Sequence, residues 1–173
     1  MAAAAAGEDL DTYLAWKRLN ASLDEEGGAY RDRPVAEWPN LHFNWDLSPE
    51  GQRFALDAVN AVAFRKQHPD GFRLGRIPLP TFDRFLCHFS RRDGPSELWE
   101  LGAPWKLAKV IAYVRRGLAI TPPLVATSEN ELRIAGGHHR YAAAKAVNLE
   151  ILPFYAAPSD VPLIDAIVQV DWA

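Results

Sequence analysis

The chain has 173 residues, of which 49% are hydrophobic, and its formal net charge at pH 7 is -3. This length and composition suit one globular domain and exclude a disordered chain, while the acidic balance disfavours a dedicated high-affinity DNA-binding protein, whose surface carries a basic excess. The single cysteine, Cys87, excludes an intramolecular disulfide and a cysteine-cluster metal site. Because no apolar run approaches the roughly 20 residues that span a bilayer, we expect no membrane insertion and a cytoplasmic location.

The sequence pattern of residues 1–71 predicts helices and ordered coil. Apolar residues recur at helical spacing over residues 8–24, which indicates an amphipathic helix that two acids and two glycines then end. Ser48 is a good N-cap and is followed by a proline at the first helical position, so we expect a second helix from there to about His68. We expect this part to pack as an extension on the rest of the chain.

From residue 72 onward, short strands alternate with helices, which predicts an α/β (or α+β) core. Residues 103–116 carry apolar side chains on one stripe, with two arginines in the last turn and Gly117 just beyond, and this pattern predicts a helix. Residues 124–127 and 131–135 predict a hairpin that leads into a pair of glycines. The other expected elements are a strand at 74–79, an alanine-rich helix after Gly137, a strand at 151–156 and a short helix at 160–169.

The most informative segment is the turn between the hairpin and the alanine-rich helix. A glycine turn that feeds a helix N-terminus leaves several backbone N–H groups unpaired, and the helix dipole adds partial positive charge there. An arginine in the first helical turn offers a guanidinium fork that suits phosphate. We therefore predict a nucleotide phosphate site made by Gly136, Gly137, His138, His139, Arg140 and Tyr141, with His138, His139 and Arg140 as candidate catalytic residues.

Each residue of this turn also has a structural interpretation. The two glycines could serve only as a tight turn, and Arg140 could form a surface ion pair. Because adjacent helical residues face different directions, we expect only one of the two histidines to touch a reacting phosphate. We expect Tyr141 to pack in the core or on an adenine ring, and Lys145 to be solvated.

With this turn, residues 103–156 resemble the ParB/sulfiredoxin superfamily, whose core has a Gly-x-x-Arg turn before an alanine-rich helix. Five of the six positions agree with the Gly-Gly-Cys-His-Arg-Tyr box of sulfiredoxin. The catalytic cysteine of sulfiredoxin falls at His138 here, and Cys87 lies about fifty positions earlier. Without a thiolate nucleophile at this position we do not expect sulfinic-acid chemistry, so the resemblance implies the nucleotide site of this superfamily without sulfiredoxin activity.

A short ParB/sulfiredoxin-like core at residues 72–173 with a helical extension at 1–71 resembles the plasmid-encoded fertility-inhibition proteins of the Osa type. This resemblance implies an ATPase with metal-dependent DNase activity that interferes with plasmid conjugation through a secretion channel. ATP, or another nucleotide, and Mg²⁺ are the implied cofactors, and DNA and a conjugation or secretion-system protein are the implied partners. Two alternatives stay open: a non-catalytic module whose affinity for a protein or DNA is switched by nucleotide, and a small-molecule kinase.

Hydrolysis or DNA cleavage also requires a carboxylate that positions water or holds Mg²⁺. The turn itself has none, but the charged stretch at 91–100 contains Glu97 and Glu100, which we treat as candidates for a general base or a metal ligand. The alternative for this stretch is a solvated loop. No set of histidines and carboxylates has zinc-ligand spacing, so the metal ligands are not identified from the sequence.

Basic residues outside the turn are the candidates for contacts with a DNA backbone. They could form a local patch with weak, salt-sensitive affinity, or an ordinary solvated helix face. Six tryptophans are many for this length, and an exposed pair of them would support a protein partner. The candidate DNA-binding residues are Arg84, Arg91, Arg92, Lys106 and Lys109.

Overall fold

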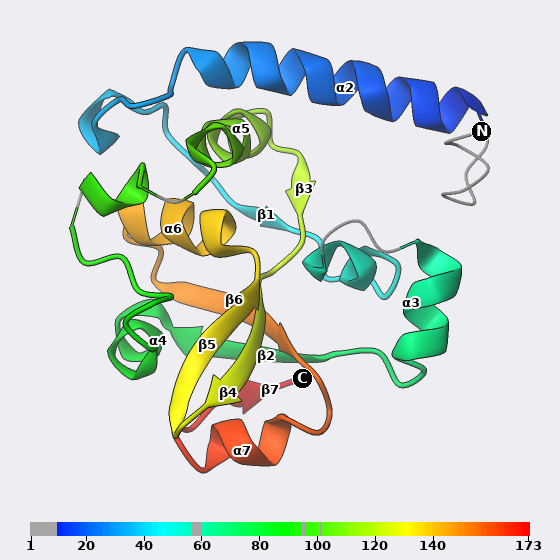
Figure 1. Ribbon diagram of the computed structural model, residues 1–173, viewed down its shortest axis with the longest axis vertical. Helices are drawn as coiled ribbons and strands as arrows, with labels where there is room; N and C mark the ends of the chain where they lie inside the picture. The colour runs from blue at the N-terminus through cyan, green and yellow to red at the C-terminus, as the bar shows by residue number, and fades with distance from the viewer. Residues whose placement is uncertain (1–9, 57–59, 95, 101) are drawn as a thin grey trace.

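The computed structural model describes residues 10–56, 60–94, 96–100 and 102–173. Helices, a mixed five-stranded sheet and a two-stranded parallel sheet make an α/β fold, which confirms the predicted class (Figure 1). The elements are α2 (Leu10–Gly28), η1 (Val35–Glu37), β1 (Asn44–Trp45), η2 (Gly51–Ala55), α3 (Ala61–Gln67), β2 (Arg73–Pro78), α4 (Leu79–Phe85), η3 (Ser96–Leu98), α5 (Pro104–Arg115), β3 (Ala119–Ile120), β4 (Leu124–Ser128), β5 (Glu131–Gly136), α6 (His138–Ala146), β6 (Ile151–Ala156), α7 (Val161–Asp165) and β7 (Asp171–Trp172).

The main sheet has five strands in the order β5-β4-β6-β2-β7. β4 and β5 form an antiparallel hairpin in which Val125 pairs with Ile134. The chain then crosses through α6 and returns as β6, which runs parallel to β4 and antiparallel to β2. This crossover places Gly137 and the N-terminus of α6 at one end of the hairpin (Figure 1).

α6 is enclosed between the sheet and α5 because the middle of the helix consists of small residues. Ala142 and Ala143 pack in the cluster that includes α5, and Ala144 packs in the core of the sheet. In that core, Ile77 of β2 pairs with Leu152 of β6, and both side chains are buried. Fully burying an aliphatic side chain of this size contributes about 1.5–3 kcal/mol.

α2 lies along α5 as the outermost layer of the molecule (Figure 1). Gly27 is buried against α5, because a Cβ atom there would lie 3.0 Å from the backbone carbonyl of Ala108. The Glu26 carboxylate forms ion pairs with Arg115 at 2.6 Å and with Arg116 at 2.7 Å. The prediction that the helix ends before Gly27 and Gly28 is therefore wrong, because α2 continues to Gly28 and packs closely on α5 at Gly27.

From residue 72 onward, each predicted strand and helix is present, but the structure adds α4, η3, β3 and β7 between or after them, so the predicted order is confirmed only in part. β2, β4, β5, β6, α5 and α6 each begin and end within one residue of the prediction where a boundary was given. The last predicted helix is shorter, since α7 ends at Asp165, and the short strand β7 was not predicted. α4 was also not predicted, although Pro80 lies in the first turn of this helix, a position that proline favours.

The predicted helix from Ser48 to His68 is wrong, because the chain forms the short η2 segment and a separate α3. Ser48 does act as a cap, since its hydroxyl oxygen accepts a hydrogen bond from the Gly51 N–H at 3.0 Å. Asn60 then starts α3, because its side-chain oxygen accepts a hydrogen bond from the Ala63 N–H at 2.8 Å. Residues 57–59 and the first residues of the other predicted N-terminal helix lie outside the described residues.

Candidate functional site

The turn between β5 and α6 requires both of its glycines for conformational reasons. Gly137 precedes the helix with a φ of +88°, in the left-handed region that glycine enters without strain. Gly136 lies against the carbonyl oxygen of Ala55, and a Cβ atom at this position would collide with that oxygen. The η2 segment therefore covers one side of the turn, so a ligand would have to approach from another side.

Arg140 points from α6 toward the connection between β3 and β4. Its Nη1 donates hydrogen bonds to the carbonyl oxygens of Thr121, at 2.7 Å, and Pro122, at 3.2 Å, and its Nη2 donates to that of Ala55 at 3.5 Å. These carbonyls therefore accept hydrogen bonds from the guanidinium N–H groups that we had expected to bind a phosphate. The guanidinium also lines a cavity of about 450 Å³ between α2, α5 and β3.

His139 points toward the N-terminus of α5. Burial is the main cause that lowers its pKa from 6.5 to about 4, and the positive charges of Lys106, His138 and Arg92 act in the same direction. A hydrogen bond with the backbone of Ala103, the residue before α5, opposes this shift. The His139 imidazole is therefore neutral at neutral pH, and it lies among groups that carry positive charge.

Two helix N-termini meet at this imidazole. Neither α5 nor α6 has a side-chain cap among the described residues, and neither has an acid in its first turn. The positive ends of both helix dipoles are therefore not compensated by a carboxylate of their own first turns. His139 Nε2 and Arg92 Nε are buried here without a hydrogen-bond partner in the described structure, which is rare for buried polar atoms.

A network on another face of α6 was not predicted. Asp83 of α4 accepts a hydrogen bond from the Tyr141 hydroxyl, and the Lys145 Nζ lies 2.8 Å from both carboxylate oxygens of Asp83. Tyr141 is buried as expected, and burial together with Asp83 raises the pKa of its hydroxyl. We had expected Lys145 to be solvated, but its ammonium group pairs with the Asp83 carboxylate. Asp83 was not predicted as a site residue, because the sequence pattern does not indicate α4.

Within the charged stretch at 91–100, side chains form an ion pair and a hydrogen bond with other residues of the same stretch. Arg91 Nε pairs with the Asp93 carboxylate at 2.9 Å. One oxygen of the Glu97 carboxylate accepts a hydrogen bond from the Asp93 N–H at 2.8 Å. Glu100 is exposed. Of the two predicted carboxylates, Glu97 thus has a role within the loop, and the structure does not bring either of them into the environment of His139 described above.

The two lysines of α5 that were predicted to bind DNA have different surroundings. Lys106 is exposed, and its Nζ lies 5.6 Å from the centroid of the Trp105 ring. Its positive charge contributes to the lowered pKa of His139. Lys109 instead pairs with Asp24 of α2 at 2.9 Å. Because α2 also supplies the acid that pairs with the two arginines at the end of α5, much of the positive charge on this helix is neutralised by ion pairs.

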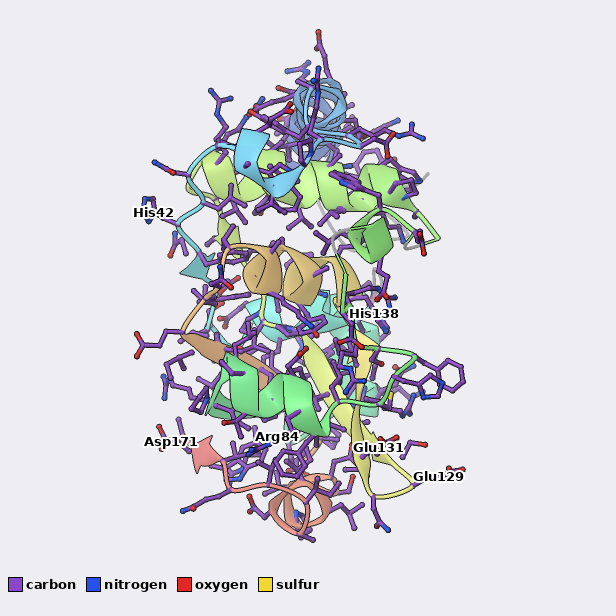
Figure 2. All side chains as sticks on the ribbon, turned by 90° about the vertical axis from the view of Figure 1, so that its left-hand side faces the viewer. His42, Arg84, Glu129, Glu131, His138 and Asp171 are labelled. Atoms are coloured by element: carbon purple, nitrogen blue, oxygen red, sulfur yellow. The ribbon has the colours of Figure 1, made fainter. Side chains whose placement is uncertain are left out.

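Arg84 is separated from the turn by the body of α4. It is exposed over the ring of Phe85, and Figure 2 shows it on the opposite side of α4 from His138. The structure therefore does not bring all five predicted DNA-binding residues together. Trp16 and Trp105 are 53% and 51% exposed, so the chain does have an exposed pair of tryptophans of the kind that would support a protein partner.

Among the described residues, no group of three or more His, Cys, Asp and Glu side chains is placed to hold a metal ion. Within the same residues, no helix is long and apolar enough to cross a membrane. Comparisons of this chain with protein-family models, curated proteins and solved structures found no match.

Proposed function

We propose that this protein binds the phosphate groups of a nucleotide where the N-termini of α5 and α6 meet, and that it hydrolyses ATP there. The environment of His139 is the observation that supports this site. Its pKa is lowered to about 4 chiefly by burial and then by repulsion from the nearby Lys106, His138 and Arg92. A bound anion would relieve that repulsion and would supply acceptors for the buried Arg92 Nε and for both helix ends.

The donors at this site fit a phosphate group better than they fit a metal ion. Lysine, arginine and backbone N–H groups donate hydrogen bonds and repel cations, and no cluster of metal ligands occurs among the described residues. Of the two candidate carboxylates, Glu97 accepts a hydrogen bond within its own loop and Glu100 is exposed. Magnesium would therefore have to arrive with the nucleotide, as it does at many phosphate sites, and we assign no step of the reaction to it.

His139 is suited to move a proton in the proposed hydrolysis. Its low pKa keeps the imidazole unprotonated at neutral pH, and its Nε2 has no hydrogen-bond partner within the described residues. When water attacks the terminal phosphorus, a P–O bond forms, the proton of the water passes to His139 and the bond to ADP breaks. The helix ends and Lys106 stabilise the negative charge that builds up on the phosphoryl oxygens.

DNA is the second proposed substrate, and interference with plasmid transfer in the cytoplasm is the proposed role. Arg92, whose charge acts on the His139 pKa, is the basic residue outside the two helices that supports a contact with a DNA backbone there, whereas Arg91 pairs with Asp93. DNA binding that depends on so few cations should weaken strongly between low and physiological salt. A competing hypothesis is that nucleotide binding switches the affinity for a protein partner, for which the exposed Trp16 and Trp105 provide the supporting observation.

The test titrates ATP, with and without Mg²⁺, by calorimetry and measures phosphate release in parallel. Lys106→Gln should weaken ATP binding at least about tenfold, because it removes a donor to a charged group. Lys109→Gln is the matched control on the same helix, because that lysine pairs with Asp24, and it should bind ATP as the wild type does. Equal affinity in both variants would refute the proposed phosphate site.

His139→Gln separates the hydrolase from the switch. If His139 accepts the proton, this variant should bind ATP within a few-fold of the wild type while phosphate release falls about a hundredfold or more, the size of a general-base effect. ATP binding by the wild type without any phosphate release, but with a change in partner affinity, would favour the switch over the hydrolase.

A further inference from the structure

The turn that follows α4 carries a phenylalanine whose side chain lies largely in solvent. Phe89 is 79% exposed, the highest value among the exposed large hydrophobic side chains of the described residues. Burial of a phenylalanine ring would stabilise the fold. A ring that stays in solvent contributes little to the fold, and its surface is open to a ligand.

Hydrogen bonds fix this turn against β5 on both sides of Phe89. The Cys87 N–H donates to the Leu132 carbonyl at 2.7 Å, and the Ser90 N–H donates to the Cys87 carbonyl at 3.0 Å. Ser90 is buried, and its hydroxyl oxygen accepts a hydrogen bond from the Ile134 N–H at 3.2 Å. The exposed position of the ring is therefore set by an ordered turn, and a ligand that packs on it meets a preorganised surface.

One side of the Phe89 ring already has an aromatic neighbour. The centroid of the His88 ring lies 3.8 Å from that of Phe89, with 37° between the two planes. His88 is also exposed. Since Phe89 remains 79% exposed in spite of this contact, its other side is open to a further planar group. Nucleic-acid bases are such groups, because every base has a flat π face that stacks on aromatic side chains.

Arg92 connects this turn to the proposed phosphate site. Its Nη1 donates hydrogen bonds to the carbonyl oxygens of Phe89, at 3.2 Å, and of Arg91, at 2.6 Å. The charge of the same guanidinium contributes to the lowered pKa of His139. The guanidinium thus lies beside the backbone of the residue that bears the exposed ring and within electrostatic reach of the imidazole at the phosphate site.

We propose that Phe89 stacks on the base of the nucleotide whose phosphate groups bind where the N-termini of α5 and α6 meet. This proposal rests on the proposed phosphate site and adds to it the group that recognises the base. A nucleotide joins a flat base to charged phosphates through a sugar, and this turn offers an open ring next to a guanidinium. Because stacking does not read the edge of the base, it favours a base over no base without selecting which one.

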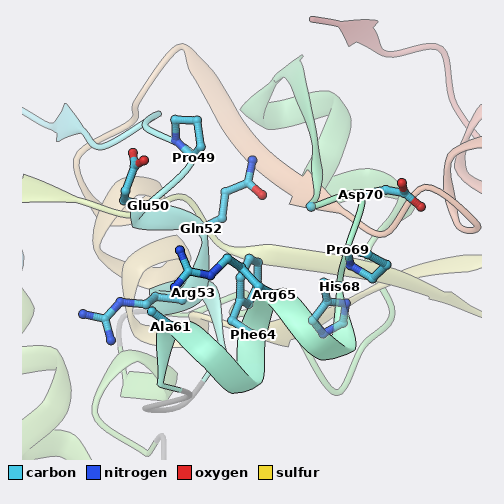
Figure 3. Close-up of a pocket in the computed structure, with 11 residues that line it drawn as sticks. Pro49, Glu50, Gln52, Arg53, Ala61, Phe64, Arg65, His68, Pro69 and Asp70 are labelled. Atoms are coloured by element: carbon cyan, nitrogen blue, oxygen red, sulfur yellow. The ribbon is translucent and has the colours of Figure 1, made fainter. Parts of the chain in front are cut away.

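Two cavities of the molecule suit the base less well. The cavity between η2 and α3 has a volume of about 570 Å³, and Figure 3 shows Phe64 among charged side chains there. Phe64 is only 6% exposed, and the described residues that line this cavity include none of the phosphate site. The cavity of about 450 Å³ between α2, α5 and β3 offers Phe54, which is 47% exposed, but the Arg53 guanidinium carbon lies 4.2 Å from the centroid of that ring.

The test compares ATP with inorganic tripolyphosphate, which has the phosphate groups without the sugar and base. In calorimetric titrations of the full chain, Phe89→Ala should bind ATP at least about fivefold more weakly than the wild type, because it removes the stacking surface. The same variant should bind tripolyphosphate as the wild type does. Phe89→Trp should restore ATP binding, since an indole ring also stacks on a base. Lys106→Gln should weaken both ligands alike, which separates the phosphate contact from the base contact.

Phe54→Ala is the matched control, because it removes another exposed phenylalanine ring, and it should bind ATP as the wild type does. Thermal unfolding establishes that each variant folds. Four results would overturn the proposal: unchanged ATP affinity in Phe89→Ala, equal loss of ATP and tripolyphosphate in that variant, an equal loss of ATP affinity in Phe54→Ala, or a loss confined to a single-stranded oligothymidine, which would assign the ring to DNA. If neither ATP nor tripolyphosphate binds to the wild type, the phosphate site itself is refuted and this proposal with it.

Discussion

Protonation of His139 should make the stability of this protein depend on pH below neutrality. The folded state lowers the pKa of this imidazole from 6.5 to about 4, chiefly by burial and then through Lys106 and its other positive neighbours. As the pH falls below 6.5, the unfolded chain therefore takes up a proton that the folded chain resists, and unfolding becomes more favourable. The stability contributed by the neutral ring is complete above pH 6.5 and is lost as the pH falls toward 4. At pH 5 the loss is about 2 kcal/mol.

The measurement is the free energy of unfolding by urea at several pH values between 4.5 and 7. Carboxylates also titrate at the acid end of this window, so the relevant quantity is the difference between the wild type and His139→Gln, which should shrink as the pH falls because glutamine takes up no proton. His88→Gln is the matched control, since His88 is exposed. A constant difference between wild type and His139→Gln over this window would refute the reasoning. Saturating ATP should reduce the pH dependence of the wild type, because a bound phosphate favours the protonated ring.

Two further predictions concern contacts that hold α6 and α2 in place. Tyr141→Phe should reduce the free energy of unfolding by about 1–3 kcal/mol, because it removes a buried donor to the charged Asp83; an unchanged urea midpoint would mean that this hydrogen bond contributes nothing net. Glu26→Gln should lower stability by less than about 2 kcal/mol, and the effect should fade in high salt, because its ion pairs with Arg115 and Arg116 are partly exposed. Glu25→Gln is its control, as this neighbour is exposed, and a salt-independent loss in Glu26→Gln would contradict the electrostatic explanation.

The sequence alone determined most of the elements from residue 72 onward, although α4, β3 and β7 were not predicted. The hairpin was predictable because Glu129 and Asn130 form a tight turn, both with positive φ, between two short apolar strands. α6 was predictable because alanines favour helix and a glycine with left-handed φ precedes it. These signals are local: each depends on residues within one or two turns of the chain, so they persist whatever the tertiary structure is.

Local signals were less reliable in the N-terminal part. Ser48 followed by proline is a correct helix-start signal, yet it produced only a 3-10 segment, because Asn60 supplies the cap of the helix that follows. Gly27 is a helix terminator by its propensity, yet α2 continues through it because its missing Cβ lets α5 approach. At Gly27, close packing outweighed a preference of about 1 kcal/mol.

The direction of each side chain in the candidate site was decided only by the tertiary structure. The sequence placed Arg140 and His139 next to each other, but the helix turns them toward different neighbours: the arginine contacts the carbonyl of Thr121, and the histidine contacts the backbone of Ala103. Asp83 and Lys145 lie 62 residues apart, and no spacing rule connects them. A sequence pattern reports the periodicity of the backbone, whereas charge, burial and hydrogen bonding at a site depend on which distant segments the folded core brings against each helix face.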